Sequence, residues 1–233
     1  MTIQMKTKPN TTRTTNAKRP QRKAATRTVD AEVVREWRPL DQASVHGVTF
    51  DGARVWFARD NELVAVDAKS EAVVRRLPVP GADAGTAFDG EHLYQLADEE
   101  ILVIRPADGR IVRKLAAPAK GRNSGMAWAD GYLWIGQFRE SRINKVDPKT
   151  GEVVKTLTSD RFVTGVSVVD GALWHGASDD GKPCELRRLA ADGTVEEALA
   201  VPVKSIAGVE GDGHGGFWCG GEKGTLRLIR RHA

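Results

Sequence analysis

The residue just before each of five recurring glycines is where this chain is most able to do chemistry. At that position stand one histidine and four small residues, namely His46, Ala84, Ser124, Thr164 and Ala207. An imidazole has an unperturbed pKa near neutrality, so His46 is the best single candidate for a group that transfers protons. The alternative is a histidine that is hydrogen-bonded at the rim of the fold without a chemical role.

Polar residues near these glycines extend the candidate site. Glu140 is the second catalytic candidate, as a general acid or base. The candidates for binding a substrate or partner are Asn123, Ser124, Gln137, Arg139, Thr164 and Lys204. Arg139 and Glu140 stand together in a polar loop, where charged residues are also common without any function.

Two further combinations of reactive residues favour a structural interpretation. His175 and Cys219 stand at equivalent places in neighbouring repeats, where a Cys–His nucleophilic pair is conceivable. The other repeats fill this place with Phe57, Gln95 and Ile135. His214 and Asp212 belong to the tight turn between the first and second strands of the last repeat, which we expect on the face opposite the candidate site. No His, Cys or carboxylate group has the spacing of a metal site, so no metal or other cofactor is expected, although ligands contributed by several repeats would leave no such spacing.

The elements that position these residues recur with a period of about 40 residues. Five leading glycines, Gly47, Gly85, Gly125, Gly165 and Gly208, are separated by 38, 40, 40 and 43 residues. Each glycine opens a short strand, a tight turn and a second strand that carries an aromatic residue, and further strands follow. Such a period is typical of a β-propeller.

The third and fourth strands of each repeat have their own patterns. Third strands alternate apolar and polar residues, and we expect them at 62–67, 100–105, 142–147, 185–190 and 225–230. Fourth strands begin with apolar, mostly β-branched residues, and we expect them at 72–77, 110–115, 152–157 and 194–199. The last repeat has no fourth strand of its own in this sequence.

A segment before the first repeat supplies the missing strand. Residues 32–37 match the fourth-strand pattern, and Val33 precedes Val73 by 40 residues. We therefore predict an all-β, five-bladed β-propeller of four-stranded antiparallel blades, with this N-terminal strand completing the last blade and closing the ring. Closure would pair strand edges that otherwise favour aggregation.

Charge divides the chain into two parts. Residues 1–28 contain eight of the 35 Lys and Arg residues and no acidic residue, which leaves 27 basic and 31 acidic residues in the remainder. We expect 1–28 to be a disordered basic tail and 29–233 to be a single propeller domain. The tail could contact nucleic acid weakly through phosphate groups, and the alternative is a solvated extension without a partner.

The sequence also bears on location. No apolar run approaches the ~18 residues of a membrane span, and no secretory leader is evident. We expect a monomer in the cytoplasm that does not contact a membrane. In such a reducing compartment Cys184 and Cys219 would be free thiols.

Two recurring units resemble known propellers. Gly-x-x-x-Asp-Gly-x-Leu-Trp, matched in part at 165–174, and Asp-Pro-x-Thr-Gly-x-Val-Val at 147–154 resemble the YncE/NHL-type propeller superfamily. Over about residues 32–233 the chain also resembles, as a scaffold, the glutamine cyclotransferase family, five-bladed propellers that convert N-terminal glutamine of peptides to pyroglutamate. Where that family has Phe-Thr-Gln-Gly, this chain has residues 44–47, Ser-Val-His-Gly, and Ala84 replaces an acidic residue. A further similarity to streptogramin lyases rests on Gly-x-Leu-Trp and residues 192–195.

Two functions remain open from the sequence. In a propeller, the loops that join fourth to first strands and second to third strands surround the mouth of the central channel. The weakness of every catalytic combination favours a non-catalytic scaffold that binds a protein or peptide through this face. The alternative is a metal-independent enzyme or small-molecule binder at the mouth, cyclotransferase-like or lyase-like, with His46 as acid or base. A concave pocket that reaches His46 would favour the enzyme, and a flat face with exposed apolar groups would favour the scaffold.

Overall fold

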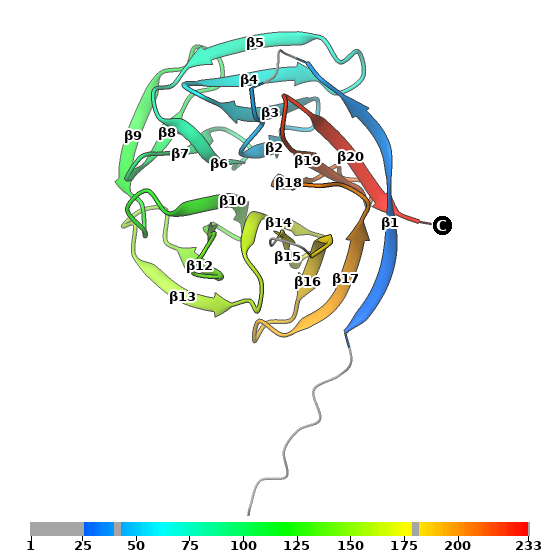
Figure 1. Cartoon of the computed structure of the whole chain (residues 1–233). Coiled ribbons are helices and arrows are strands. Elements are labelled where there is room, and N and C mark those ends of the chain that lie inside the picture. The colour runs from blue at the N-terminus through cyan, green and yellow to red at the C-terminus, as the bar shows by residue number, and fades with distance from the viewer. Residues whose placement is uncertain (1–25, 40–42, 179–181, 233) are drawn as a thin grey trace, which may run out of the picture.

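A computed structural model of the chain describes residues 26–39, 43–178 and 182–232. Within these ranges every regular element is a β-strand, and the strands lie in sheets around a common centre (Figure 1). The predicted all-β class is confirmed, and the arrangement is that of a β-propeller. Most of the predicted basic tail, residues 1–25, lies outside the described residues.

Three antiparallel sheets have four strands each, in the order of the sequence. The first contains β2 (Val48–Phe50), β3 (Arg54–Arg59), β4 (Glu62–Asp67) and β5 (Val73–Pro78). The second contains β6 (Ala82–Phe88), β7 (Leu93–Ala97), β8 (Glu100–Ile104) and β9 (Ile111–Ala116). The third contains β10 (Asn123–Ala129), β11 (Tyr132–Gln137), β12 (Arg142–Val146) and β13 (Val153–Thr158). The first strand of each sheet lies nearest the centre and the fourth at the rim (Figure 1).

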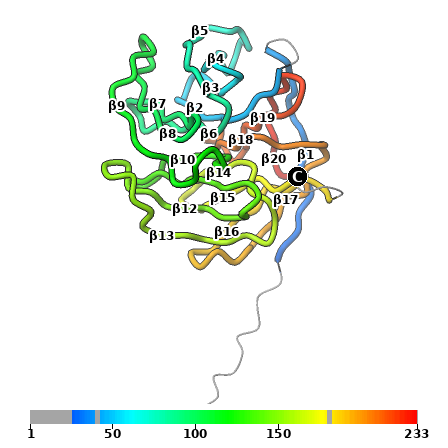
Figure 2. The backbone as a smooth tube through the Cα atoms, turned by 60° about the vertical axis from the view of Figure 1, so that its left-hand side comes forward, coloured from blue at the N-terminus to red at the C-terminus, as the bar shows by residue number. Residues whose placement is uncertain are grey.

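The other strands form one mixed sheet of eight, in the order β14-β15-β16-β17-β1-β20-β19-β18. Its first antiparallel unit contains β14 (Val163–Val169), β15 (Ala172–Ala177), β16 (Cys184–Leu189) and β17 (Val195–Val201). Its second unit contains β18 (Ala207–Gly211), β19 (Phe217–Gly220) and β20 (Leu226–Arg231). The strand β1 (Arg27–Trp37) lies between the two units and joins them (Figure 2).

The strand β1 pairs with two partners in succession. Its residues from Ala31 to Trp37 pair antiparallel with β20, as predicted for residues 32–37. Its first four residues, from Arg27 to Asp30, pair in parallel with β17. The strand therefore begins two residues inside the segment assigned to the tail, because the edge of β17 offers backbone partners that no local pattern reveals.

A side chain at the third residue of β5, β9 and β13 ties each of these outer strands to the next sheet. The basic side chains of Arg75, Arg113 and Lys155 donate to the carbonyl oxygens of Ala107, Pro148 and Ala191 at 2.7, 2.6 and 2.6 Å. Arg35 of β1 donates in the same way to the carbonyl of Ala68 at 2.8 Å. Each acceptor lies in the turn between the third and fourth strands of the following sheet. In β17 this position is Glu197, which pairs instead with Arg231 of β20.

The leading glycines allow the inner strands to pack closely around the centre. A Cβ atom on Gly85 would lie 2.4 Å from the backbone nitrogen of Met126, and one on Gly125 would lie 2.4 Å from the Cα atom of Gly165. No larger residue fits at these distances without moving the backbone. Glycine is therefore required at these two positions of the repeat.

Candidate functional site

The loops that enter the inner strands and those that join second to third strands lie at one end of the sheets, because neighbouring strands are antiparallel. This end is called the loop face. Asn123 at the start of β10 is the cross-strand partner of Gln137 on β11. Ser124 Oγ donates to the carbonyl of Val163 at 2.6 Å, which places it beside Thr164 on the neighbouring strand β14. The fold thus brings several predicted residues together between β10 and β14.

Glu140 joins this group from the loop between β11 and β12. Its Oε1 atom forms an ion pair of 2.7 Å with Nη1 of Arg122, the residue before Asn123. Asn123, Ser124, Glu140 and Thr164 are called the mouth cluster. They come from two inner strands and one loop, so the repeat positions chosen from the sequence converge on one place.

Three oxygen atoms of the mouth cluster are buried and have no hydrogen-bond partner among the described residues: Asn123 Oδ1, Glu140 Oε2 and Thr164 Oγ1. The Asn123 amide is oriented by its Nδ2 group, which donates to the carbonyl of Ala119 at 2.8 Å. Leaving a buried acceptor without a donor costs about 1–3 kcal/mol. Such atoms therefore mark places where a water molecule or a ligand completes the structure.

Three of the predicted residues are not members of the mouth cluster. His46 precedes β2, where its N–H donates to the carbonyl of Ala58 at 3.0 Å, and β6 lies between β2 and β10 in the ring of inner strands. Lys204 stands in the loop before β18, and Arg139 is exposed in the loop before β12. Within the described ranges no hydrogen bond or ion pair joins the His46 imidazole to Glu140, so the two catalytic candidates do not form a pair.

An apolar pair of rings borders the mouth cluster. Phe138, next to Gln137, and Phe162 have ring centroids 4.9 Å apart, and both side chains are half-buried. The N–H of Val163 donates to the carbonyl of Phe138 at 3.3 Å, which links the two loops that carry the rings. The loop face therefore combines free acceptors with an adjoining aromatic surface.

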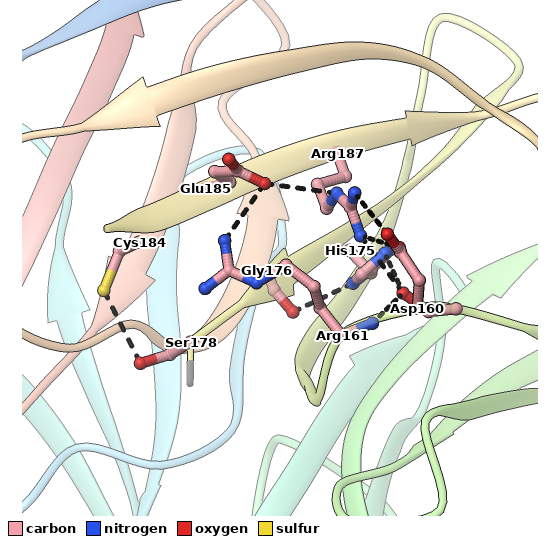
Figure 3. Close-up of polar contacts among 9 residues, drawn as sticks. Asp160, Arg161, His175, Gly176, Ser178, Cys184, Glu185 and Arg187 are labelled. Carbon is pink, nitrogen blue, oxygen red and sulfur yellow. Dashed lines mark hydrogen bonds and ion pairs between the residues drawn. The ribbon is translucent and has the colours of Figure 1, made fainter. Parts of the chain in front are cut away.

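A second polar group of the loop face was not predicted from the sequence. Arg187 on β16 contacts Asp160 Oδ1 at 2.5 Å and Glu185 Oε2 at 3.2 Å, and Arg161 contacts Glu185 Oε2 at 3.1 Å (Figure 3). Both guanidinium groups are buried. The hydrogen bond from Arg187 lowers the pKa of Asp160, as expected for a carboxylate beside a fixed cation.

His175 lies fully buried beside this network. Its Nδ1 atom is 2.9 Å from the carbonyl of Gly176, which can only accept, so Nδ1 carries the proton and Nε2 faces Ser159 Oγ at 3.3 Å. Burial lowers the pKa of His175 to about 4. The imidazole is therefore neutral at pH 7 and too weakly basic to activate Ser159 well.

The position of His175 has a structural equivalent in the second sheet. Gln95 is also fully buried, and its Nε2 donates to the carbonyl of the next residue, Leu96, at 2.6 Å. His175 makes the same bond to Gly176. Cys219 fills the corresponding place on β19, where burial raises the pKa of the thiol. These contacts support a structural role at all three positions.

Ser159, Asp160 and Arg187 also border a cavity of about 490 Å³ on the outer side of the loop face. Its remaining walls come from Val195, Gly193 and four polar residues, Thr26, Thr158, Asp192 and Thr194. The cavity thus lies where β13 and β17 approach each other. His46 does not line it.

Glu210 on β18 is the other unusual polar residue. Its Oε2 accepts from Thr49 Oγ1 at 2.9 Å, and its Oε1 accepts from Ser167 Oγ and from the N–H of Gly211, both at 2.8 Å. One carboxylate therefore bridges the inner strands β2 and β14. Burial, opposed by these bonds, raises the pKa of Glu210 to about 6.

Replacing Glu210 by glutamine is expected to stabilise the protein near neutral pH. The folded-state pKa of about 6 exceeds the ordinary value of 4.5, so the folded state loses stability as the pH rises from about 4.5 to 6 and does not regain it above. This pKa shift corresponds to a loss of at most about 2 kcal/mol in the free energy of unfolding. Urea unfolding of Glu210→Gln and the parent at pH 4.5 and 7.5 should show a stability difference that grows by that amount. A difference independent of pH would contradict the assignment.

Two kinds of feature are absent from the described part of the chain. No three His, Cys, Asp or Glu side chains there are grouped to hold a metal ion. No helix in those ranges is both long and apolar enough to cross a bilayer. Cys184 and Cys219 are buried free thiols.

No family model matches the chain, and no curated protein does so. Solved structures do. The glutaminyl cyclase of Myxococcus xanthus superposes with a TM-score of 0.73 at 17% identity, over 88% of this chain and 98% of that one. The WD40 β-propeller domain of Doa1 superposes with a TM-score of 0.54 at 15% identity, over 79% of this chain and 63% of that one. Hydrazine synthase of Kuenenia stuttgartiensis superposes with a TM-score of 0.50 at 15% identity, over 77% of this chain and 56% of that one.

At these identities the likeness concerns the fold alone. It agrees with the scaffold resemblance to the cyclotransferases seen in the sequence, whereas membership of the YncE/NHL-type superfamily stays a prediction. The strand order, the close inner strands and the solved structures agree on one conclusion: the chain is a β-propeller.

Proposed function

We propose that the chain forms five blades and that β1 closes the ring. The three four-stranded sheets are three blades, and the eight-stranded sheet is two blades joined at their outer strands. In this interpretation β1 is the fourth strand of the blade that contains β18, β19 and β20. Two observations support it: the antiparallel pairing of β1 with β20, and the bond from Arg35 to Ala68, which repeats the contact made by the other outer strands.

On this frame we propose a non-catalytic scaffold that binds a peptide, or an extended segment of a protein, on the loop face. The observation that carries the proposal is the set of buried oxygens without partners in the mouth cluster. Asn123 Oδ1 and Glu140 Oε2 can only accept, so a ligand must bring hydrogen-bond donors, either N–H or O–H groups. A peptide offers several in a row, and Phe138 and Phe162 provide an adjoining surface for one of its apolar side chains.

The chemistry of the loop face favours binding over catalysis. Ser124 Oγ donates to a backbone carbonyl, and Ser159 faces an imidazole whose pKa is about 4. Neither serine has a base matched to neutral pH. His46 lines neither the cavity of about 490 Å³ nor the cavity of about 380 Å³ at the opposite end of the molecule.

Thr164→Val is expected to stabilise the free protein while weakening peptide binding. The valine removes a buried hydroxyl without a partner at nearly constant volume, which favours folding by about 1 kcal/mol. The same change removes a bond to the peptide, and affinity should fall about tenfold. Peptides selected from a random displayed library against the full chain would be titrated by calorimetry.

The control for peptide affinity is Thr156→Val on the outer strand β13, which removes the bond from Thr156 Oγ1 to Asn144 Oδ1 at 2.7 Å but no group of the mouth cluster. It should leave the peptide affinity unchanged. Equal affinities for the parent and for Thr164→Val would show that the peptide binds elsewhere and would overturn the proposal.

The enzymatic alternative rests on one specific observation, the free carboxylate oxygen of Glu140. A cyclotransferase-like enzyme would release ammonia from peptides with N-terminal glutamine, and Glu140→Gln would abolish the release. The scaffold proposal predicts no ammonia above the rate without protein. Catalytic release of ammonia that is lost in Glu140→Gln would contradict the scaffold proposal and support the enzyme.

A further inference from the structure

A second cavity lies at the end of the molecule opposite the loop face, between β20 and the turns of the first sheet. Its volume is about 380 Å³, within the range of small-molecule sites. Apolar walls come from Phe50, Trp218 and Leu228, and polar groups at its edge include Lys69 and Asp212. This space is called the seam cavity, because it joins the last strands of the chain to the first sheet.

Trp218 in the wall of the seam cavity lacks the partner that its counterpart has. Its side chain is only 4% exposed, and its Nε1 atom has no hydrogen-bond acceptor among the described residues. In the first sheet, Trp56 Nε1 donates to Asp51 Oδ2 at 2.8 Å. A buried N–H group without an acceptor costs free energy, and an acceptor added by a ligand would remove this cost at Trp218.

The aspartate that could have served Trp218 is engaged elsewhere. Asp212, in the turn before β19, accepts from the N–H groups of His214 and Gly216, both at 2.7 Å, and from Arg230 Nη2 at 3.1 Å. Its carboxylate is held by these bonds. The indole N–H of Trp218 therefore has no acceptor in the part of the chain that the structure describes.

Aromatic side chains make the wall around Trp218 suited to a flat ligand. Trp37 packs edge-on against Trp218 with centroids 5.5 Å apart, and Phe50 lies 6.2 Å from it. Trp37 Nε1 also has no partner in the described ranges. Rings of this kind favour offset-stacked or edge-to-face contact with another aromatic group.

Basic side chains outnumber carboxylates in the lining of the seam cavity, which includes Arg35, Lys69 and Arg230 beside Asp67 and Asp212. Asp67 accepts from the N–H groups of Lys69 and Ser70 and from Ser70 Oγ, and Asp212 is held as described. The Lys69 side chain is exposed and forms no ion pair or hydrogen bond within the described residues. An anionic ligand is thus favoured over a cationic one.

We propose that the seam cavity binds a small aromatic carboxylate, whose ring packs against Trp218 and Phe50. Its carboxylate accepts from Trp218 Nε1 and is attracted by Lys69. The site is separate from the mouth cluster and does not depend on the function proposed there. Because the ligand contacts both β19 and the first sheet, its binding stabilises the junction between the last strands and the first.

The probe is 4-fluorobenzoate, observed by fluorine NMR line broadening and titrated into the full chain by calorimetry. Its neutral counterpart 4-fluorobenzamide and its cationic counterpart 4-fluorobenzylamine serve as matched ligands. The carboxylate is expected to bind about tenfold more tightly than either. Equal binding of all three probes, or no binding of the carboxylate at millimolar concentration, would overturn the proposal.

Two variants locate the site. Trp218→Phe keeps a ring but removes the N–H donor, and Lys69→Gln removes the charge; each should weaken binding of 4-fluorobenzoate about tenfold. Lys149→Gln is the control, because Lys149 follows Asp147 in the third sheet as Lys69 follows Asp67 in the first. Should Trp218→Phe fail to fold, the two lysine variants decide alone. Unchanged affinity in Lys69→Gln would contradict the assignment.

Discussion

A chain that begins at residue 38 is expected not to fold, whereas a chain that begins at residue 26 should be as stable as the full protein. Without β1, both β17 and β20 lose a paired neighbour. The contacts of Arg35 with Glu71 and the carbonyl of Ala68 are lost at the same time. Partly buried Val29 and Val33 no longer cover the buried cluster that includes Ile229.

Circular dichroism during thermal and urea unfolding would measure this effect. A third chain that begins at residue 31 keeps the antiparallel pairing with β20 but loses the parallel pairing with β17. Its stability should lie between those of the other two. If the chains beginning at 26 and 38 melted at the same temperature, β1 would have no part in closing the ring.

His175→Gln is expected to remove most of the loss of stability in weak acid. The pKa of His175 is lowered from 6.5 to about 4 by burial, so the unfolded state binds a proton more readily between these values. The stabilising contribution of the neutral imidazole is complete above pH 6.5 and is lost as the pH falls toward 4. The shift corresponds to about 3 kcal/mol.

Glutamine is a suitable replacement because Gln95 already makes the equivalent bond to the carbonyl of Leu96 in the second sheet. Urea unfolding at pH 4.0 and 7.0 would compare the parent, His175→Gln and the exposed control His214→Gln. In all three proteins the contribution of Glu210 to stability increases as the pH falls from about 6 to 4.5. The effect of His175 is therefore measured as the difference in unfolding free energy between the variants and the parent. A parent and a His175→Gln variant with the same pH dependence would show that the imidazole does not titrate as inferred.

The strands were predictable because each repeat states the same pattern. The third strand expected at 62–67 is β4, Glu62–Asp67, and the outer strands expected at 72–77 and 110–115 are β5 and β9, each beginning one residue later. Apolar alternation fixes which residues face the core, and the turns fix where the pattern restarts. The parallel half of β1 escaped notice because pairing with β17, about 170 residues away in the sequence, leaves no local signal.

The candidate site was only partly predictable. Asn123, Ser124 and Thr164 were found because equivalent positions in a repeat lie at equivalent places in space. The network around Arg187 was missed, since Asp160 and Arg187 are 27 residues apart and nothing in their spacing indicates a contact. His46 was chosen because it differs from the small residues at the equivalent positions of the other repeats. The fold nevertheless places it two inner strands away from the mouth cluster. The missing acceptor of Trp218 depends on where the Asp212 carboxylate points, which no pattern in the sequence indicates.

Hydrogen–deuterium exchange of the full chain with and without a selected peptide would show whether the peptide binds on the loop face. Protection is expected in the loop-face segments 117–124, 137–141 and 158–164, because their side chains supply the free oxygens and the aromatic surface. Exchange in the outer strands β5, β9 and β13 should stay unchanged. Protection confined to those strands, or to the turns at the opposite end, would contradict the claim that the loop face is the binding surface.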